Sequence, residues 1–223
     1  MLQINNAVFP SPEQWKAAIT GMRHPMLSYA ASDSYFTHIE NPDTLNTAAF
    51  QFFLGDSDLK LMRRLCKAGS DHRKFMRMLP VFADVTAPRY WWAEYDTYKV
   101  GTVANSTSTM HKLTHKRFAL SDFSYEDCDE WTRENVCRPT VDALNMLRNK
   151  YLETHDKTLW RNMIQLLPAS YNQRRTLFLN YEVLLAIRRA RKDHKLSEWK
   201  TFCDWIDTVP YFLAVTLFAE DTE

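Results

Sequence analysis

The sequence predicts an α+β fold, a mainly helical single domain over residues 1–223 with a small antiparallel sheet. Apolar residues recur at helical spacing through most of the chain, whereas residues 75–95 are rich in aromatic and β-branched side chains typical of strands. No repeat, low-complexity tract or Gly/Ser linker divides the 223 residues. A chain of this length buries a core without needing a disulfide or a metal.

Two helices are expected in the first third of the chain. Ser11 is a good helix cap, and the proline that follows it suits the first helical turn. Apolar residues recur at helical spacing over 59–66, with Asp56 or Ser57 as the expected cap and Gly69 as the stop. Both segments predict amphipathic helices.

The rest of the chain is expected to add one or two strands and then mostly helix. Residues 78–85, which precede a proline, predict extended structure. An apolar stripe over 141–152 continues toward a helix end at Leu167–Pro168. A long helix is predicted over 174–193 and a further one from Ser197.

Composition excludes several classes of protein. The four glycines, Gly21, Gly55, Gly69 and Gly101, are too scattered for a P-loop or a dinucleotide-binding fingerprint. The formal charge of +1 provides no large field for nucleic acid or an anionic membrane. Neither partner is therefore expected.

No metal site is expected, because the histidines and cysteines fit no common ligand spacing. The four cysteines, Cys66, Cys128, Cys137 and Cys203, are expected to be reduced thiols. The first residues lack the pattern of a signal peptide, and the longest apolar run, 211–219, is too short for a membrane span. A soluble, cytoplasmic protein is the expectation.

Two neighbouring segments are candidates for chemistry. Residues 87–98 contain a dense run of aromatics, which either pack in a core or oligomer interface or form a stacking surface for a planar ring such as a flavin or a base. Residues 101–112 are rich in hydroxyls and end in His111–Lys112. They are either a solvated turn or a site for a sugar phosphate.

A third candidate is a polar helix face near the C-terminus. If one helix runs far enough, its stripe presents an amide, a guanidinium, an imidazole and a carboxylate. The residues of this stripe are Asn180, Ile187, Arg191, His194 and Glu198. The alternative is a solvated basic helix end over 188–192, which the helix dipole favours.

The spacing in this region resembles the flavin-dependent (ThyX-type) thymidylate synthases. Asn180 lies twelve residues after Pro168, and Arg191 lies eleven residues further on. His194 follows one residue earlier than the family's histidine. Glu198–Trp199 follows in the reverse of the family's Trp-Glu order. The resemblance is strongest over residues 65–205.

The family signature, Arg-His-Arg-x-x-Ser-x-Asn-Glu-x-Ser-x-Arg, is matched only in part. Counted from Pro88, the segment 98–100 (Tyr-Lys-Val) falls on Arg-His-Arg, and Asn105–Ser106 falls on Asn-Glu. Ser108 falls on the last serine and Met110 on the final arginine. Up to three cations of the signature are therefore replaced.

The resemblance implies a role for each matching residue. Arg191 would be the catalytic residue that polarises the uracil ring, a role that suits a guanidinium. The substrate-binding residues would be Asn105, Ser106, Ser108 and Arg191. The cofactor-binding residues would be His72, Tyr98, Lys99, Asn180 and His194. Substitute phosphate contacts would come from Lys99, His111 and Lys112, and substitute stacking on the flavin from Trp92 and Tyr95.

The resemblance also implies an activity: one-carbon transfer to C5 of a pyrimidine deoxynucleotide, dUMP or an analogue. It implies FAD as cofactor, methylenetetrahydrofolate and NADPH as co-substrates, and a homotetramer with sites between subunits. The lost signature arginines leave open a non-catalytic nucleotide-binding or structural protein that keeps the fold. A third hypothesis, nucleic-acid binding through residues 188–192, is weakened by the neutral overall charge.

Overall fold

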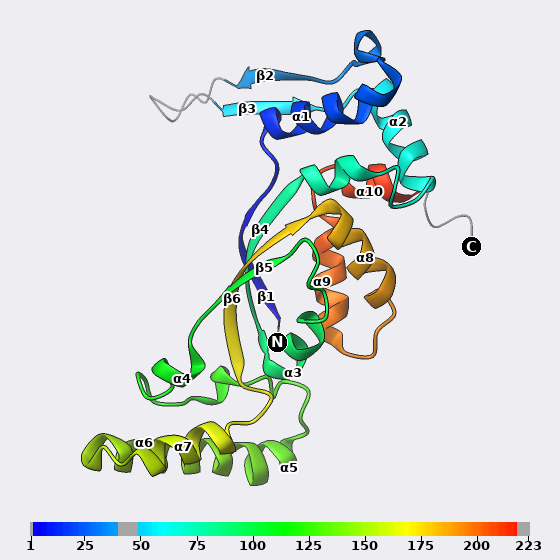
Figure 1. The fold of residues 1–223 in the computed structure, drawn as a ribbon. Coiled ribbons are helices and arrows are strands. Elements are labelled where there is room, and N and C mark those ends of the chain that lie inside the picture. The colour runs from blue at the N-terminus through cyan, green and yellow to red at the C-terminus, as the bar shows by residue number, and fades with distance from the viewer. Residues whose placement is uncertain (1, 40–48, 218–223) are drawn as a thin grey trace. The chain divides into compact units, whose positions relative to one another are not determined.

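A computed structural model describes residues 2–39 and 49–217 (Figure 1). The chain divides into two compact units, each described here by itself. Unit 1 comprises Met1–Asn5, Asp84–Thr97 and Ala104–Leu177, and unit 2 comprises Asn6–Ala83, Tyr98–Val103 and Phe178–Glu223.

Helices outweigh strands in the described chain, and the strands form two small sheets. A four-stranded sheet has the order β1-β4-β6-β5, and β2 pairs antiparallel with β3. The strands are β1 (Gln3–Val8), β2 (Tyr35–Ile39), β3 (Ala49–Phe53), β4 (Pro80–Pro88), β5 (Val103–Ser106) and β6 (Asn172–Asn180). The helices before β6 are α1 (Pro12–Arg23), α2 (Asp56–Lys67), α3 (Arg89–Tyr95), α4 (Thr109–Lys112), α5 (Glu130–Thr132), α6 (Arg138–Thr154) and α7 (Lys157–Leu166). The helices after it are α8 (Tyr181–Arg191), α9 (Ser197–Asp207) and α10 (Phe212–Thr216).

The predicted fold class, mainly helical α+β with a small antiparallel sheet, is confirmed. The assignment of residues 1–223 to one domain stays a prediction.

Unit 1 contains a helical hairpin, α6 and α7, that packs on the chain preceding it (Figure 1). Its apolar cluster consists of Leu113, Phe118, Phe123, Val141, Leu144, Met163 and Leu167. Buried Asn145 joins the layers, because its side chain accepts from the Phe118 amide and donates to the Phe118 carbonyl, both at 2.9 Å. This amide satisfies a backbone segment that enters the core without regular structure.

The predicted stripe over 141–152 is only partly correct. Val141 and Leu144 are buried, but Leu152 is 43% exposed. The helix does not continue toward Leu167, because His155 adopts a left-handed conformation (φ 54°) and Asp156 caps the new helix α7. The cap at Asp156 therefore divides the segment that periodicity predicted as one continuous helix into α6 and α7.

The aromatic block of unit 1 forms core rather than a stacking surface. Residues 89–95 are helix α3 and not a strand, and its Trp91, Trp92 and Tyr95 are at most 2% exposed. Trp92 Nε1 donates to the Gln173 carbonyl at 2.9 Å, and the Arg175 guanidinium lies 4.2 Å from the ring centroid of Trp92. The expectation that Trp92 and Tyr95 stack on a flavin is therefore wrong, because their faces are already covered.

Unit 2 contains α1, whose predicted start is confirmed. Ser11 accepts from the Gln14 amide, and the Gln14 side chain accepts from the Ser11 amide, which is a complete capping box. The cap expected for α2 at Asp56 or Ser57 is wrong, because Gly55 is its N-cap. A Cβ at Gly55 would lie 2.2 Å from the Asp33 carboxylate, so only glycine fits there.

The long helix predicted over 174–193 is only partly correct, because α8 covers just Tyr181–Arg191. Residues up to Asn180 form strand β6, in which Leu177 and Leu179 are buried and Phe178 is less so, the alternation of a strand. Asn180 then caps α8, its Oδ1 accepting from the Val183 amide at 3.0 Å. Because α8 ends at Arg191 and α9 starts at Ser197, the predicted stripe from Asn180 to Glu198 does not form.

The helix predicted from Ser197 is confirmed as α9. Its Trp199, Phe202 and Ile206 are completely buried. They face α8, with which α9 packs within unit 2. This pairing fixes the environment of the C-terminal end of α8, where Arg191 lies.

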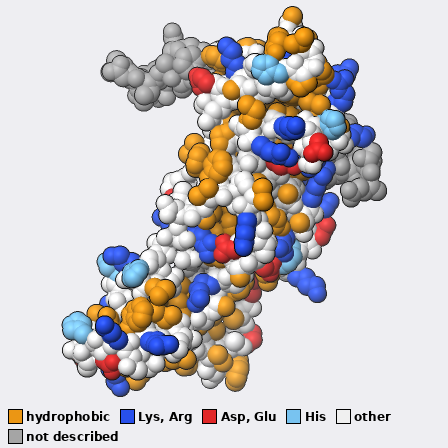
Figure 2. Space-filling model, in the orientation of Figure 1, with side chains coloured by type: hydrophobic (Ala, Val, Ile, Leu, Met, Phe, Trp, Pro, Cys, Tyr) orange, Lys and Arg blue, Asp and Glu red, His pale blue; other side chains and the backbone are white. Residues whose placement is uncertain are grey.

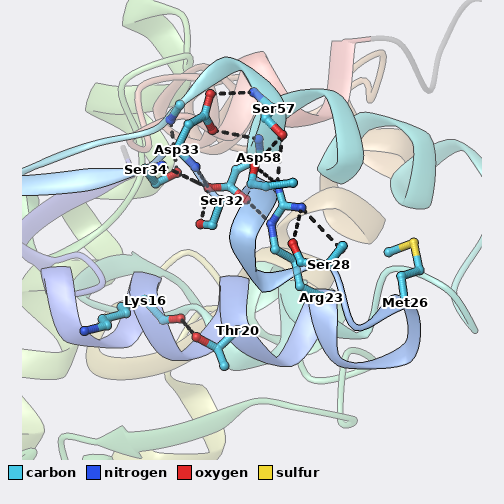
Figure 3. Close-up of polar contacts among 12 residues, drawn as sticks. Lys16, Thr20, Arg23, Met26, Ser28, Ser32, Asp33, Ser34, Ser57 and Asp58 are labelled. Carbon is cyan, nitrogen blue, oxygen red and sulfur yellow. Dashed lines mark hydrogen bonds and ion pairs between the residues drawn. The ribbon is translucent and has the colours of Figure 1, made fainter.

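A buried ion pair joins the end of α1 to the start of α2 (Figure 3). Arg23 Nε lies 2.6 Å from Asp58 Oδ1, and Asp58 Oδ2 accepts from the hydroxyls of Ser32 and Ser34. Burial raises the pKa of Asp58, but hydrogen bonds from Ser34, Arg23 and Ser32 outweigh it and hold that pKa below its usual value. These hydrogen bonds hold residues 28–34 against the start of α2.

Candidate functional site

Arg191, the predicted catalytic residue, lies in unit 2 between two aromatic rings. Its Nε donates to the Tyr98 hydroxyl at 2.9 Å. Its guanidinium carbon lies 4.7 Å from the ring centroid of Trp199 and 5.7 Å from that of Tyr98. Trp199 is fully buried and Arg191 partly exposed, so the cation rests on a rigid apolar support and reaches solvent.

Tyr98 is itself held by a tight turn. The Thr102 hydroxyl donates to the Tyr98 carbonyl at 2.5 Å, and Gly101 adopts φ 77°. The Asn180 side-chain amide donates to the Gly101 carbonyl at 3.4 Å. The turn is thereby tied to the N-cap of α8, while Tyr98 contacts Arg191, the last residue of the same helix.

His194 lies beside the same tryptophan. It follows α8 in a turn, where its Nδ1 accepts from the Leu196 amide at 3.2 Å, and its ring centroid is 6.3 Å from that of Trp199. Unit 2 therefore brings together Arg191, Tyr98 and His194 around Trp199. Their predicted roles toward substrate and cofactor stay predictions.

Three further residues predicted to bind cofactor also lie in unit 2. Asn180 is 5% exposed, and both ends of its amide bond the backbone, so its observed contacts are structural. His72 lies in an exposed turn after α2, and Lys99 is exposed beside Tyr98. Neither His72 nor Lys99 belongs to the Trp199 cluster.

The predicted substrate-binding residues other than Arg191 lie in unit 1. Asn105 and Ser106 are on β5, a strand that is exposed throughout. Ser108 caps α4, its hydroxyl accepting from the His111 amide at 3.2 Å. The hydroxyl-rich segment is thus a short strand and a helix cap.

Ser108 also lines a cavity of about 710 Å³ that is formed entirely by unit 1. Its wall carries the side chains of Lys112, His115, Lys116 and Arg174, together with the carboxylates of Asp122 and Glu126. Two of these cations are paired, Lys116 with Asp122 at 2.5 Å and Arg174 with Asp84. Figure 2 shows basic and histidine side chains grouped over the region of α4.

The remaining wall of the cavity suits a polar ligand. Thr107, Thr109, Asn172 and Gln173 supply hydroxyls and amides, and Phe118, Phe123 and Tyr171 supply rings. A volume of this size is typical of small-molecule sites. Cations, amides and rings together are the chemistry that recognises a phosphorylated heterocycle.

Sequence reasoning named Ser108 and Lys112 but missed Arg174, His115 and Lys116. Arg174 lies six residues after Pro168, between that proline and Asn180. The sequence places Arg174 in a predicted helix, which gives no reason to expect it at a site. In the structure Arg174 belongs to strand β6, where it lines the cavity. Reading 172–180 as an alternating strand would have flagged it.

The cysteines do not form an activated nucleophile. All four are free, and Cys66, Cys137 and Cys203 are buried. Burial raises the pKa of Cys66, and it raises that of Cys203 to about 11. Both thiols are therefore protonated at neutral pH. Within residues 2–39 and 49–217, no helix is both long and apolar enough to cross a membrane.

The architecture is that of the flavin-dependent thymidylate synthase fold. Two solved structures of ThyX from Helicobacter pylori, each with FAD and dUMP, match this chain with TM-scores of 0.65 and 0.66 at 17% sequence identity. The matches cover 99% of this chain and 98% and 99% of the two ThyX chains. No protein-family model and no curated protein sequence matches. The likeness establishes the fold that the sequence resemblance predicted.

Proposed function

We propose that this chain is a divergent flavin-dependent thymidylate synthase-like enzyme that transfers a one-carbon unit to C5 of a pyrimidine deoxynucleotide, dUMP or an analogue. The observation that carries the proposal is the cavity of unit 1, where Ser108 lies with Lys112, Lys116 and Arg174. The full-length fold match to ThyX structures that hold FAD and dUMP supports the same substrate class.

In this proposal the cavity binds the nucleotide phosphate. Met110 stands where the family signature has its final arginine and offers no charge. Arg174 and Lys112 supply cations on the wall of the same cavity, and the Ser108 hydroxyl supplies a hydrogen-bonding group. Charge-assisted contacts of this kind compensate for the lost arginine.

Arg191 acts in the proposal on the pyrimidine ring. A guanidinium stabilises negative charge that develops on a carbonyl oxygen, provided that it is oriented before the reaction. The contacts of Arg191 with Tyr98 and Trp199 support such an orientation. The proposal includes a homotetramer whose sites combine residues of neighbouring subunits.

The residues at the signature positions do not fit the contacts by which the resembled family binds its flavin cofactor. Of the three positions that correspond to Arg-His-Arg, Tyr98 bonds Arg191, Val100 is 90% exposed and Lys99 is the single cation. Neither tyrosine nor valine provides the charge-assisted contacts of an arginine. A bound flavin would need other contacts, so flavin binding is the decisive measurement for catalysis.

The first test measures dUMP binding by calorimetry. The unsubstituted protein is expected to bind, and Arg174→Ala is expected to weaken binding by about 10- to 100-fold, the loss of a charged contact. Arg161→Ala, on the exposed side of α7, is the matched control and should bind normally. Equal affinities for all three proteins would contradict the phosphate assignment.

The second test supplies FAD, NADPH and methylenetetrahydrofolate with dUMP and measures formation of dTMP. Turnover that is lost in Arg191→Ala supports the enzyme proposal. The replaced signature segment favours a second candidate, a non-catalytic nucleotide-binding protein with the same fold. Binding of dUMP without flavin binding or turnover would select that candidate.

A further inference from the structure

We infer that Tyr98 is a positioning residue for Arg191, in a place where the resembled family holds its flavin. The Tyr98 hydroxyl accepts the Arg191 Nε–H at 2.9 Å. The inference rests on the proposed function for the role of Arg191 toward the nucleotide. It adds a residue whose side chain orders that guanidinium through a neutral hydrogen bond.

Two contacts from different directions define the guanidinium plane. The hydroxyl of Tyr98 fixes Nε, and the ring of Trp199, 4.7 Å from the guanidinium carbon, supports one face. A free arginine side chain loses rotamer entropy when it engages a ligand. Holding the side chain before the ligand arrives removes part of that cost.

The support extends from Tyr98 to the other end of α8. Gly101, at φ 77°, allows the turn in which the Thr102 hydroxyl bonds the Tyr98 carbonyl. Asn180 caps α8 and also donates to the Gly101 carbonyl. Residues 98–103 therefore connect the first turn of α8 with Arg191 in its last turn. Contacts with α8 itself thus hold Tyr98 in position.

The contact also accounts for the residue type at position 98. An arginine there would place a second cation beside Arg191, whereas tyrosine provides an acceptor and a ring face for it. Phenylalanine would keep the ring and lose the acceptor. The hydroxyl is thus the group to remove in a test.

The first experiment observes Arg191 without any ligand. The arginine Nε–H resonances are recorded by ¹H–¹⁵N NMR, and the Arg191 signal is identified by its loss in Arg191→Lys. In Tyr98→Phe this signal is expected to shift or broaden. The matched control is Tyr211→Phe, which loses a hydroxyl bonded to the Phe52 carbonyl at 2.9 Å elsewhere in unit 2. An Arg191 signal that is unchanged in Tyr98→Phe would overturn the inference.

The second experiment measures dUMP affinity by calorimetry. Tyr98→Phe is expected to weaken binding by about tenfold, the size of one hydrogen bond to a charged group. Because Tyr98 acts through Arg191, Tyr98→Phe should weaken binding no further in an Arg191→Ala background. An additive loss would overturn the positioning role.

The two experiments separate this inference from the function on which it rests. If the unsubstituted protein does not bind dUMP, the proposed function fails, and with it the role of Tyr98 toward the nucleotide, while the NMR signal still decides whether Tyr98 orders Arg191. If Arg191→Ala weakens dUMP binding and Tyr98→Phe does not, the proposed function stands and the positioning role fails.

Discussion

The charged side chains described in the two units differ in their environment. In unit 2, Arg23 and Asp58 are buried against each other, and Arg191 is held between Tyr98 and Trp199. In unit 1, the cations around the cavity are exposed, Lys112 and Arg174 among them. Although Lys116 and Arg174 also form ion pairs, we expect the exposed cations of unit 1 to affect ligand binding and the held charges of unit 2 to maintain structure and geometry. Substitutions in the two units should therefore change different measurements.

The largest expected effect is on the buried pair of unit 2. Asp58→Ala leaves Arg23 buried without its carboxylate, which costs about 3–5 kcal/mol in the free energy of unfolding. Urea denaturation measures the loss. Asp56→Ala, in the exposed first turn of the same helix, is the control and should cost less than about 1 kcal/mol. Equal losses would show that the buried pair contributes no more than a helix-end charge.

A smaller loss of stability is expected for the neutral polar core of unit 1. Asn145→Ala leaves the amide and carbonyl of Phe118 without their partner, which costs about 1–3 kcal/mol. The same denaturation experiment measures it, with Asn149→Ala on the exposed part of α6 as control. No difference between the two variants would mean that water satisfies the Phe118 backbone.

The exposed cations of unit 1 are expected to affect binding and not stability. Lys112→Ala should weaken dUMP binding by about fivefold and leave the free energy of unfolding within about 0.5 kcal/mol. Lys150→Ala, an exposed lysine of α6, is the control. A stability loss without a change in affinity would reverse the assignment of the two units.

The smallest effect is expected in the acid dependence of stability. The folded-state pKa of Asp58 is lowered, so its contribution is present above the ordinary pKa of about 3.9 and is lost as pH falls through the folded value. Asp58→Asn should therefore show a shallower loss of stability below about pH 4. Thermal unfolding between pH 2 and 6 measures the slope, and parallel curves for both proteins would contradict the lowered pKa.

Local signals predicted the parts of the fold that local physics decides. The capping box at Ser11 and the apolar face of α9 are complete within a few residues of sequence. The fold class followed from the balance of such segments. The four-stranded sheet order did not, because pairing between strands distant in sequence leaves no local pattern.

The error over 174–193 shows where periodicity is ambiguous. Leu177, Leu184 and Leu185 fit a helical stripe, yet Leu177 belongs to a strand and the other two to α8. Asn180 was the available signal, since a residue of this type before an apolar periodic run favours a helix start. The same error hid Arg174, one of the cations on the cavity wall.

The residue-level site could be predicted only in part. Spacing from Pro168 singled out Arg191, and the contact with Tyr98 joins it to another predicted residue. The contact itself was not predictable, because position 98 was aligned with a cation for the flavin. For the aromatic block the packed-core alternative is confirmed, although composition alone does not distinguish a stacking surface from rings that cover one another.

Gly101 makes the geometry of Arg191 sensitive to a residue that does not touch it. A side chain at this position would face the Asn180 amide at 3.0 Å and Val183 at 3.2 Å, in a backbone conformation that L-residues rarely adopt. Among related sequences, glycine here should accompany a tyrosine three residues earlier and an arginine ninety residues later. This trio is therefore the pattern to look for in sequences related to this chain.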